Sequence, residues 1–195
     1  MKVVEIDGSM LEGGGQILRV SVALSAVSRV PVRVVNIRAK RSNPGIRPQH
    51  LTAIKAVAEL VEARVEGLRV GSRELVFIPS RPRAGSFSFD VGTAGSTTLV
   101  LQSLMPAAAL APSRVIVEVK GGTNNPLAPP VDYVEKVLAP ILLKMGYRCS
   151  LTTLRRGFYP RGGGIVRATL EPVEELSPIR LESWRGGVKV RGLAY

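Results

Sequence analysis

A glycine turn near the start of the chain is the first feature whose composition suggests chemistry. Residues 12–19 read Glu-Gly-Gly-Gly-Gln-Ile-Leu-Arg, and the glycines lead into a segment with helical spacing. Glycines at the start of a helix expose backbone N–H groups at its positive end, where an anion binds. Glu12 would hold a metal ion or a ribose hydroxyl there, and Arg19, one helical turn in, would reach back toward a phosphate. The alternative interpretation is a tight turn with a solvated Glu12 and Arg19.

A basic loop, residues 38–50, leads into a second predicted helix. It contains four cations, Arg38, Lys40, Arg41 and Arg47. Cations gathered at a helix N-terminus bind a triphosphate or an RNA terminus, and the prolines and the glycine fix the path of this loop. A solvated charged loop is the alternative. His50, the single histidine, is predicted to be a hydrogen-bonded cap or a stacking surface rather than a nucleophile or a base.

Two polar segments in the middle of the chain repeat this arrangement. In residues 93–102 a glycine again precedes a helix, and Ser96 and Thr97 would bond phosphate oxygens. Gln102 follows in an otherwise apolar helix, so its amide needs either a buried backbone partner or a ligand. The proline-rich segment 121–132 is predicted to be a rigid loop beside the first site.

A third kind of segment, residues 155–164, combines cations, aromatic residues and glycines. This combination is typical of RNA contacts at a strand edge, although a plain turn is equally allowed. The candidate RNA contacts are Arg47, Arg155, Arg156, Tyr159 and Arg161. The sequence contains no Walker A pattern, no convincing Ser–His–Asp set and no metal-ligand spacing of His or Cys, which excludes several common classes of enzyme.

The elements that position these motifs form two copies of one unit. Strands are predicted at 3–7, 32–37, 74–78 and 86–91, with helices at 16–28 and 49–62. The pattern returns about 80 residues later, with helices at 95–111 and 131–145 and strands at 114–119 and 164–170. The predicted fold class is therefore α+β, with one βαβαββ repeat over 1–92 and a second over 93–178. A further strand-like run at 187–193 has no partner in the sequence, so we expect the natural protein or assembly to continue.

Composition limits the partners and the compartment. Lys and Arg number 27 against 15 Asp and Glu, and the net charge of +12 favours a polyanionic partner, although a basic, heat-adapted surface is the alternative. The single cysteine excludes an internal disulfide framework and favours a reducing, cytoplasmic environment. No long apolar run occurs, so neither export nor membrane insertion is expected.

Five phrases of the sequence together resemble the RNA 3′-terminal phosphate cyclase family. They are residues 12–19, 37–56, 95–102, 121–134 and 155–164, and the resemblance runs over nearly the whole chain. It implies three βαβαββ repeats and a small inserted α/β domain. Two of the repeats are present here, and residues 179–195 would begin the inserted domain.

The resemblance also implies a chemistry. Family members use ATP and a divalent metal, Mg²⁺ or Mn²⁺, to adenylylate a histidine, and then move AMP to an RNA 3′-phosphate. The neighbouring 2′-hydroxyl attacks, AMP leaves, and a 2′,3′-cyclic phosphate remains. Residue by residue, Glu12 matches the family's metal and nucleotide-site acid, and Arg19, Arg38 and Arg41 match its phosphate-binding arginines. Gln49, His50 and Gln102 match further positions of the family's nucleotide pocket. Pro129 matches a position that lines the adenine.

One departure limits what the resemblance implies for these 195 residues. The family's nucleophilic histidine lies in the C-terminal part, beyond Tyr195, and His50 does not correspond to it. We therefore expect the chain alone to be inactive unless a second polypeptide or self-association completes the fold.

Two other classes remain open. A non-catalytic relative that binds RNA in ribosome assembly would need no nucleophile, but such relatives tend to replace Glu12, Arg19, Arg38 and Arg41. Enolpyruvyl transferases have repeats of similar topology, but they lack phrases like residues 121–130 and 161–164.

Overall fold

The computed structural model describes residues 2–183, 186–192 and 194, and it contains two successive βαβαββ units. The first comprises β1 (Val4–Asp7), α1 (Gly15–Ser28), β2 (Val32–Val35), α2 (Pro48–Leu60), β3 (Arg64–Glu66) and β4 (Leu75–Ile78). The second begins with β5 (Gly85–Asp90), α3 (Thr97–Ala108) and β6 (Val115–Gly121). It continues through α4 (Val131–Tyr133), η1 (Val134–Leu138), α5 (Ala139–Lys144), β7 (Cys149–Arg155) and β8 (Gly164–Leu170). The predicted α+β class is confirmed.

The two sheets have the same topology. Their strand orders are β1-β2-β4-β3 and β5-β6-β8-β7. In each, the first pair of strands is parallel and the other two pairs are antiparallel. The repeat inferred from the sequence is therefore a repeat of structure.

The sequence prediction assigned one strand to the wrong unit. Residues 86–91 were predicted to close the first repeat, but β5 pairs in parallel with β6 and belongs to the second sheet. The strand that completes the first sheet is β3, which has three residues and is too short to show an alternating pattern. The polar strand β7 was also missed, because four of its seven residues are Ser, Thr or Arg.

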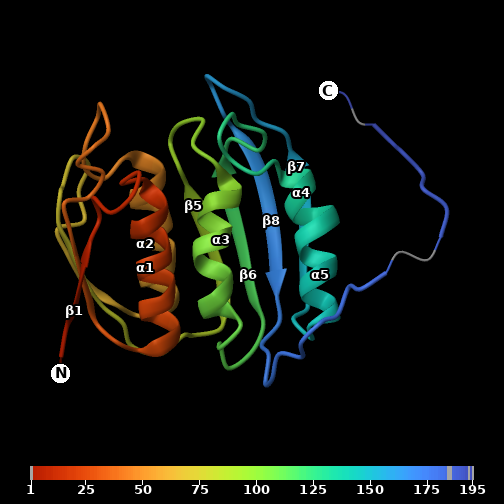
Figure 1. Ribbon diagram of the computed structural model, residues 1–195, viewed down its shortest axis with the longest axis horizontal. Helices are drawn as coiled ribbons and strands as arrows, with labels where there is room; N and C mark the ends of the chain where they lie inside the picture. The colour runs from red at the N-terminus through yellow and green to blue at the C-terminus, as the bar shows by residue number, and fades with distance from the viewer. Residues whose placement is uncertain (1, 184–185, 193, 195) are drawn as a thin grey trace.

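The C-terminal segment departs from the prediction as well. No helix or strand occurs in the described residues after β8, which include 187–192 of the predicted run at 187–193, while Leu193 lies outside the described residues. Figure 1 shows this segment leaving the second unit as an extended chain. No helix in the described residues is long and apolar enough to cross a membrane.

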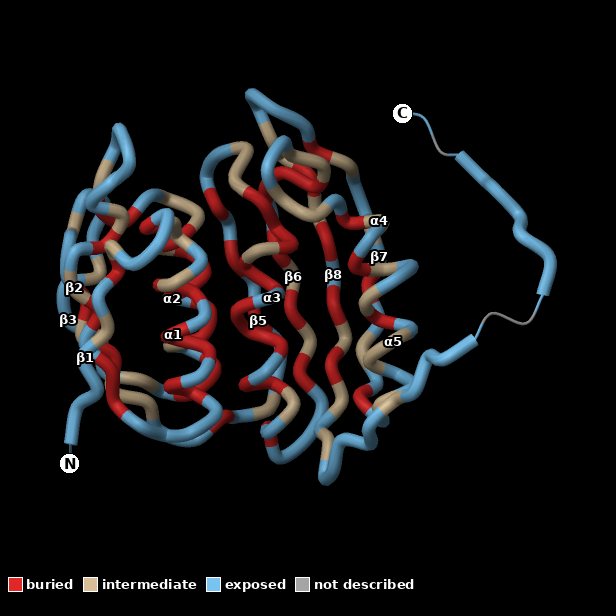
Figure 2. The backbone as a smooth tube through the Cα atoms, viewed as in Figure 1, coloured by how far each residue is buried: buried red, intermediate tan, exposed pale blue. Residues whose placement is uncertain are grey.

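The helices join the two units through one core. Figure 1 shows α1 and α2 between the first sheet and the second unit, and both helices pack against α3. Figure 2 shows buried residues on the facing sides of these helices and on the strands behind them. The buried apolar side chains form a single cluster that includes Leu18 and Phe77 of the first unit and Leu104 and Val117 of the second. The positions of the helix N-termini therefore depend on a shared core.

A single core predicts a cooperative loss of structure. We expect Leu104→Ala, a truncation of a fully buried side chain in α3, to lower the free energy of unfolding by about 2–5 kcal/mol. Leu24 lies on α1 and is 60% exposed. The same change there, Leu24→Ala, should lower the free energy of unfolding by less than about 0.5 kcal/mol. Denaturant unfolding followed by circular dichroism measures both. Amide exchange that accelerates in β6 but not in β2 after Leu104→Ala would show that the units have separate cores.

Candidate functional site

Three helix N-termini meet at one cavity of about 970 Å³. Its wall contains Gly14 and Gly15 at the start of α1, Gln49 and His50 at the start of α2, and Leu99 in the first turn of α3. None of these three helices, which the structure describes in full, has an acidic residue in its first turn. Their positive ends are therefore not neutralised from within, which favours an anion in the cavity.

Arg19 adds a buried cation to the same wall. The residue is 9% exposed, and burial lowers the pKa of its guanidinium below its ordinary value. Its Nε atom is buried and has no hydrogen-bond partner among the described residues. A buried cation without a counter-charge is costly, and a bound anion would remove that cost.

Arg38 and Arg41 line the cavity from the basic loop. Nη1 of Arg38 donates hydrogen bonds to the backbone oxygens of Asn43 and Gly45, which fixes the loop. Burial, and then the charges of Arg47 and Arg41, lower the pKa of Arg38. The side chain of Arg38 is therefore held among like charges, an arrangement that an anionic ligand would stabilise.

Glu12 supplies the one carboxylate that lines this cavity among the described residues. Its Oε2 atom lies 3.4 Å from Nη2 of Arg41, and its side chain is almost fully exposed. Such a pair contributes little to stability, so ligand binding can break it at small cost. The described residues contain no group of three or more His, Cys, Asp or Glu suited to a metal ion. Glu12 therefore fits Mg²⁺ only together with phosphate oxygens and water, which is how this ion usually binds nucleotides.

His50 has the capping role expected from the sequence. Its Nδ1 atom accepts a hydrogen bond of 3.2 Å from the backbone N–H of Arg47 at the start of α2. Burial, and then the charges of Arg19, Arg38 and Arg47, lower the pKa of His50 to about 3. The Nε2 atom lies against Gly15, where a Cβ atom would collide with it. His50 is therefore a neutral, enclosed side chain that holds the starts of α1 and α2 together.

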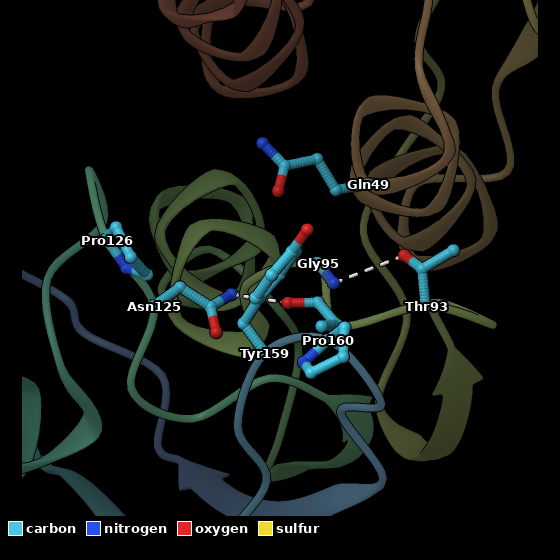
Figure 3. Close-up of a pocket in the computed structure, with 8 residues that line it drawn as sticks. Gln49, Thr93, Gly95, Asn125, Pro126, Tyr159 and Pro160 are labelled. Atoms are coloured by element: carbon cyan, nitrogen blue, oxygen red, sulfur yellow. Dashed lines mark hydrogen bonds between the residues drawn. The ribbon is translucent and has the colours of Figure 1, made fainter.

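Gln49 connects this cavity to a second one. Its Oε1 atom accepts a hydrogen bond of 3.3 Å from the backbone N–H of Ser96, which ties α2 to the start of α3. On its other side lies a cavity of about 460 Å³, shown in Figure 3. The other residues that line it are Thr93, Ala94, Gly95, Asn125, Pro126, Tyr159 and Pro160. The sequence prediction did not include Asn125, whose Nδ2 atom donates to the backbone oxygen of Ala94 and holds this wall in place.

Gln102 and Pro129 lie apart from the two larger cavities. Together with Thr98 and Tyr133 they line a small depression of about 30 Å³, in which Thr98 Oγ1 donates to the backbone oxygen of Pro129. Gln102 is exposed, so its amide is open to solvent and does not need the buried backbone partner that the sequence analysis allowed for. Its helix carries apolar residues on the face toward the core, whereas Gln102 lies on the opposite face.

The fold itself uses the hydroxyls of Ser96 and Thr97. Both residues are buried. Ser96 Oγ lies 2.7 Å from Thr98 Oγ1 and accepts from the backbone N–H of Leu99, while Thr97 Oγ1 donates to the backbone oxygen of Gly122. These hydroxyls cap α3 and join it to β6, so they do not line the cavity as the sequence suggested.

The five candidate RNA contacts have different surroundings in the fold. Arg156 forms a two-pronged ion pair with Asp132 at 2.8 and 2.9 Å, which joins the β7–β8 loop to α4. Arg155 donates from Nε to the backbone oxygen of Gly163, and Arg47 and Arg161 are exposed. Tyr159 is the member of this set that lines a cavity.

The depressed pKa of His50 predicts a pH dependence. Its ordinary value is 6.5, so between about pH 6.5 and pH 3 the unfolded chain binds the proton more tightly than the folded chain. The contribution of His50 to stability is therefore complete above pH 6.5 and is lost as the pH falls toward 3, by at most about 1.4 kcal/mol per pH unit. His50→Asn should flatten this part of the stability profile. NMR of the single imidazole should show a neutral ring down to pH 4.5, and a titration midpoint near pH 6.5 would contradict the enclosed position.

The contact between Gly15 and His50 predicts an energetic coupling. Gly15→Ala should lower the free energy of unfolding by about 1–3 kcal/mol, because the new methyl group overpacks the site against Nε2 of His50. In a His50→Ala background the same change should cost at least about 1 kcal/mol less, because the imidazole has been removed. A double-mutant cycle by chemical denaturation measures the difference, and equal costs in both backgrounds would contradict the contact.

Comparison with known proteins agrees with this arrangement. A family profile described as "RNA 3′-terminal phosphate cyclase" matches residues 10–188. A protein of that name from Ignicoccus hospitalis is 55% identical over 99% of this chain and 55% of its own length. The relatives of the same name from Hyperthermus butylicus and Methanopyrus kandleri are 53% and 51% identical, over 54% and 55% of their lengths. The chain thus spans about half the length of these relatives, and it belongs to the RNA 3′-terminal phosphate cyclase family.

Proposed function

We propose that this chain supplies the nucleotide- and phosphate-binding part of an ATP-dependent enzyme that converts an RNA 3′-terminal phosphate into a 2′,3′-cyclic phosphodiester. The names of its relatives support the reaction. Arg19 carries the assignment of the site, because this buried arginine lines the cavity at which three helix N-termini meet and its Nε has no hydrogen-bond partner among the described residues.

Each part of ATP has a proposed position. The phosphates bind Arg19, Arg38 and Arg41, together with the N–H groups at the start of α1. A divalent ion, Mg²⁺ or Mn²⁺, bound by Glu12 would neutralise phosphate charge and strengthen the α-phosphorus as an electrophile. The adenine lies toward Gln102 and Pro129, where the depression of about 30 Å³ must widen to admit it.

The chemistry proceeds by transfer of AMP. A histidine attacks the α-phosphorus of ATP and releases pyrophosphate, and AMP then passes to the RNA 3′-phosphate. The adjacent 2′-hydroxyl displaces AMP and closes the cyclic diester, so AMP is the leaving group that the RNA phosphate alone lacks. His50 is not the nucleophile in this proposal. Its Nδ1 accepts a hydrogen bond from the backbone N–H of Arg47 and its Nε2 lies against Gly15, so the imidazole is used to pack the two helix starts together.

Arg19 provides a test that separates binding from structure. Arg19→Leu should weaken ATP binding at least about tenfold, because a charge-assisted hydrogen bond to phosphate is lost. The free chain should keep its melting temperature or gain a few degrees, because an unpaired buried charge has been removed. Arg64→Leu, at an exposed arginine paired with Glu66, is the matched control and should leave ATP binding unchanged. Isothermal titration calorimetry and thermal melting supply the data, and a variant that melts early but binds ATP normally would make Arg19 structural.

The role of His50 is tested by labelling. With ATP labelled in the α-phosphate and with Mg²⁺, the chain of 195 residues should take up no acid-labile AMP, whereas the full-length Ignicoccus relative should be labelled. Acid-labile AMP on His50 would overturn the proposal that the nucleophile lies elsewhere. Absence of ATP binding in both proteins would instead favour a non-catalytic RNA-binding role.

A further inference from the structure

The cavity of about 460 Å³ beside Gln49 has no place in the nucleotide site described above. We propose that it holds the terminal nucleoside of the RNA, with the base stacked on Tyr159 and the 3′-phosphate directed past Gln49 into the larger cavity. This inference rests on the proposed function, since it names where the RNA end of that reaction binds.

Tyr159 has an exposed ring on a fixed backbone. The residue is 77% exposed, yet the loop that carries it, residues 156–163, is tied down on both sides. Gly162 N–H donates to the backbone oxygen of Phe158 at 2.6 Å, and Thr123 N–H donates to that of Gly157 at 2.8 Å. An aromatic ring held in solvent by a fixed loop loses little conformational entropy when a base stacks on it.

Close packing fixes this loop against the start of α3. At Gly162 a Cβ atom would lie 2.7 Å from both Ala94 Cα and the backbone oxygen of Thr93, so only glycine fits there. Thr93 and Ala94 themselves line the cavity, as does Tyr159 three residues before Gly162. Figure 3 shows Tyr159 and Gln49 reaching the cavity from separate segments, the β7–β8 loop and the start of α2. The fold therefore sets the distance between the loop that carries Tyr159 and the start of α3, to which Gln49 is hydrogen-bonded.

The smaller cavity is uncharged and the larger one is charged, which matches the neutral nucleoside and the anionic phosphate of a nucleotide. Among the described residues that line the smaller cavity none is charged, and its polar groups are the amides of Gln49 and Asn125 and the hydroxyls of Thr93 and Tyr159. The larger cavity contains three arginines and one carboxylate. A base and its ribose are neutral and a terminal phosphate is an anion, so each part matches one cavity. The volume also lies in the range of small-molecule sites.

Gln49 is the residue that the two cavities share. Its Oε1 atom is used by Ser96 N–H, which leaves its two amide hydrogens as donors at the boundary. A donor at that position suits the phosphate or the 2′-hydroxyl of a nucleoside that spans the boundary. The proposal thus places the reacting end of the RNA next to the phosphates of ATP.

The first test is the affinity for a five-nucleotide RNA with a 3′-phosphate. Tyr159→Leu should weaken binding about tenfold, the loss expected for one stacked base, while Tyr159→Trp should bind at least as well as the native chain. Phe158→Leu is the matched control, because Phe158 is an exposed aromatic neighbour on the same loop that does not line the cavity. Its affinity should stay within about twofold of the native value. Fluorescence anisotropy of a 5′-labelled RNA measures all four proteins.

The second test locates the base. An RNA with 5-iodouridine as its last nucleotide should crosslink to Tyr159 under long-wavelength ultraviolet light, and peptide mapping by mass spectrometry identifies the site. The same RNA with 5-iodouridine at its first nucleotide should give at most about a tenth of that crosslink.

The outcomes separate this inference from the function on which it depends. If the chain binds ATP and the RNA, but Tyr159→Leu binds as tightly as Phe158→Leu, the base does not stack on Tyr159 and only this inference fails. A terminal crosslink to a residue outside the smaller cavity has the same meaning. If neither ATP nor the RNA binds the native chain, the proposed function fails as well.

Discussion

The packing of α1, α2 and α3 against one another is the constraint on which the rest of the molecule depends. It directs three positive helix ends at one place, and no carboxylate in their first turns reduces the resulting potential. Arg19 increases that potential from a buried position. Gathering these positive charges in one place opposes folding. The helices nevertheless stay in position because one apolar core spans both sheets and packs against them.

Close contacts between the helix starts convert this packing into a defined site. Gly15 allows the imidazole of His50 to lie against α1, and the amide oxygen of Gln49 accepts a hydrogen bond from Ser96, the N-cap residue of α3. Both side chains belong to neighbouring positions of α2, so one helix start determines the spacing of the other two. The same position of Gln49 divides a charged cavity from a neutral one. In the functions proposed for them, the charged cavity binds anions and the neutral cavity binds an aromatic base.

The sequence was most informative where a residue type has few structural uses. Three glycines before a helix predicted an anion site, and six of the eight predicted nucleotide-site residues line one cavity. It was least informative where pairing between distant segments decides the outcome. The strand β3 is too short for a periodic signal, so β5 was assigned to the wrong sheet. The pairing of Arg156 with Asp132 likewise left no signal in the sequence, because it depends on how a loop folds back on α4.

The central claim is that the guanidinium group of Arg19 and the start of α1 form a phosphate site. A crystal structure of the chain with the non-hydrolysable analogue α,β-methylene-ATP tests it most directly. We predict phosphate oxygens within about 3 Å of a guanidinium nitrogen of Arg19 and of the backbone N–H groups at Gly14 and Gly15. Clear density for the analogue elsewhere on the chain, with no phosphate oxygen on the guanidinium of Arg19, would contradict the account.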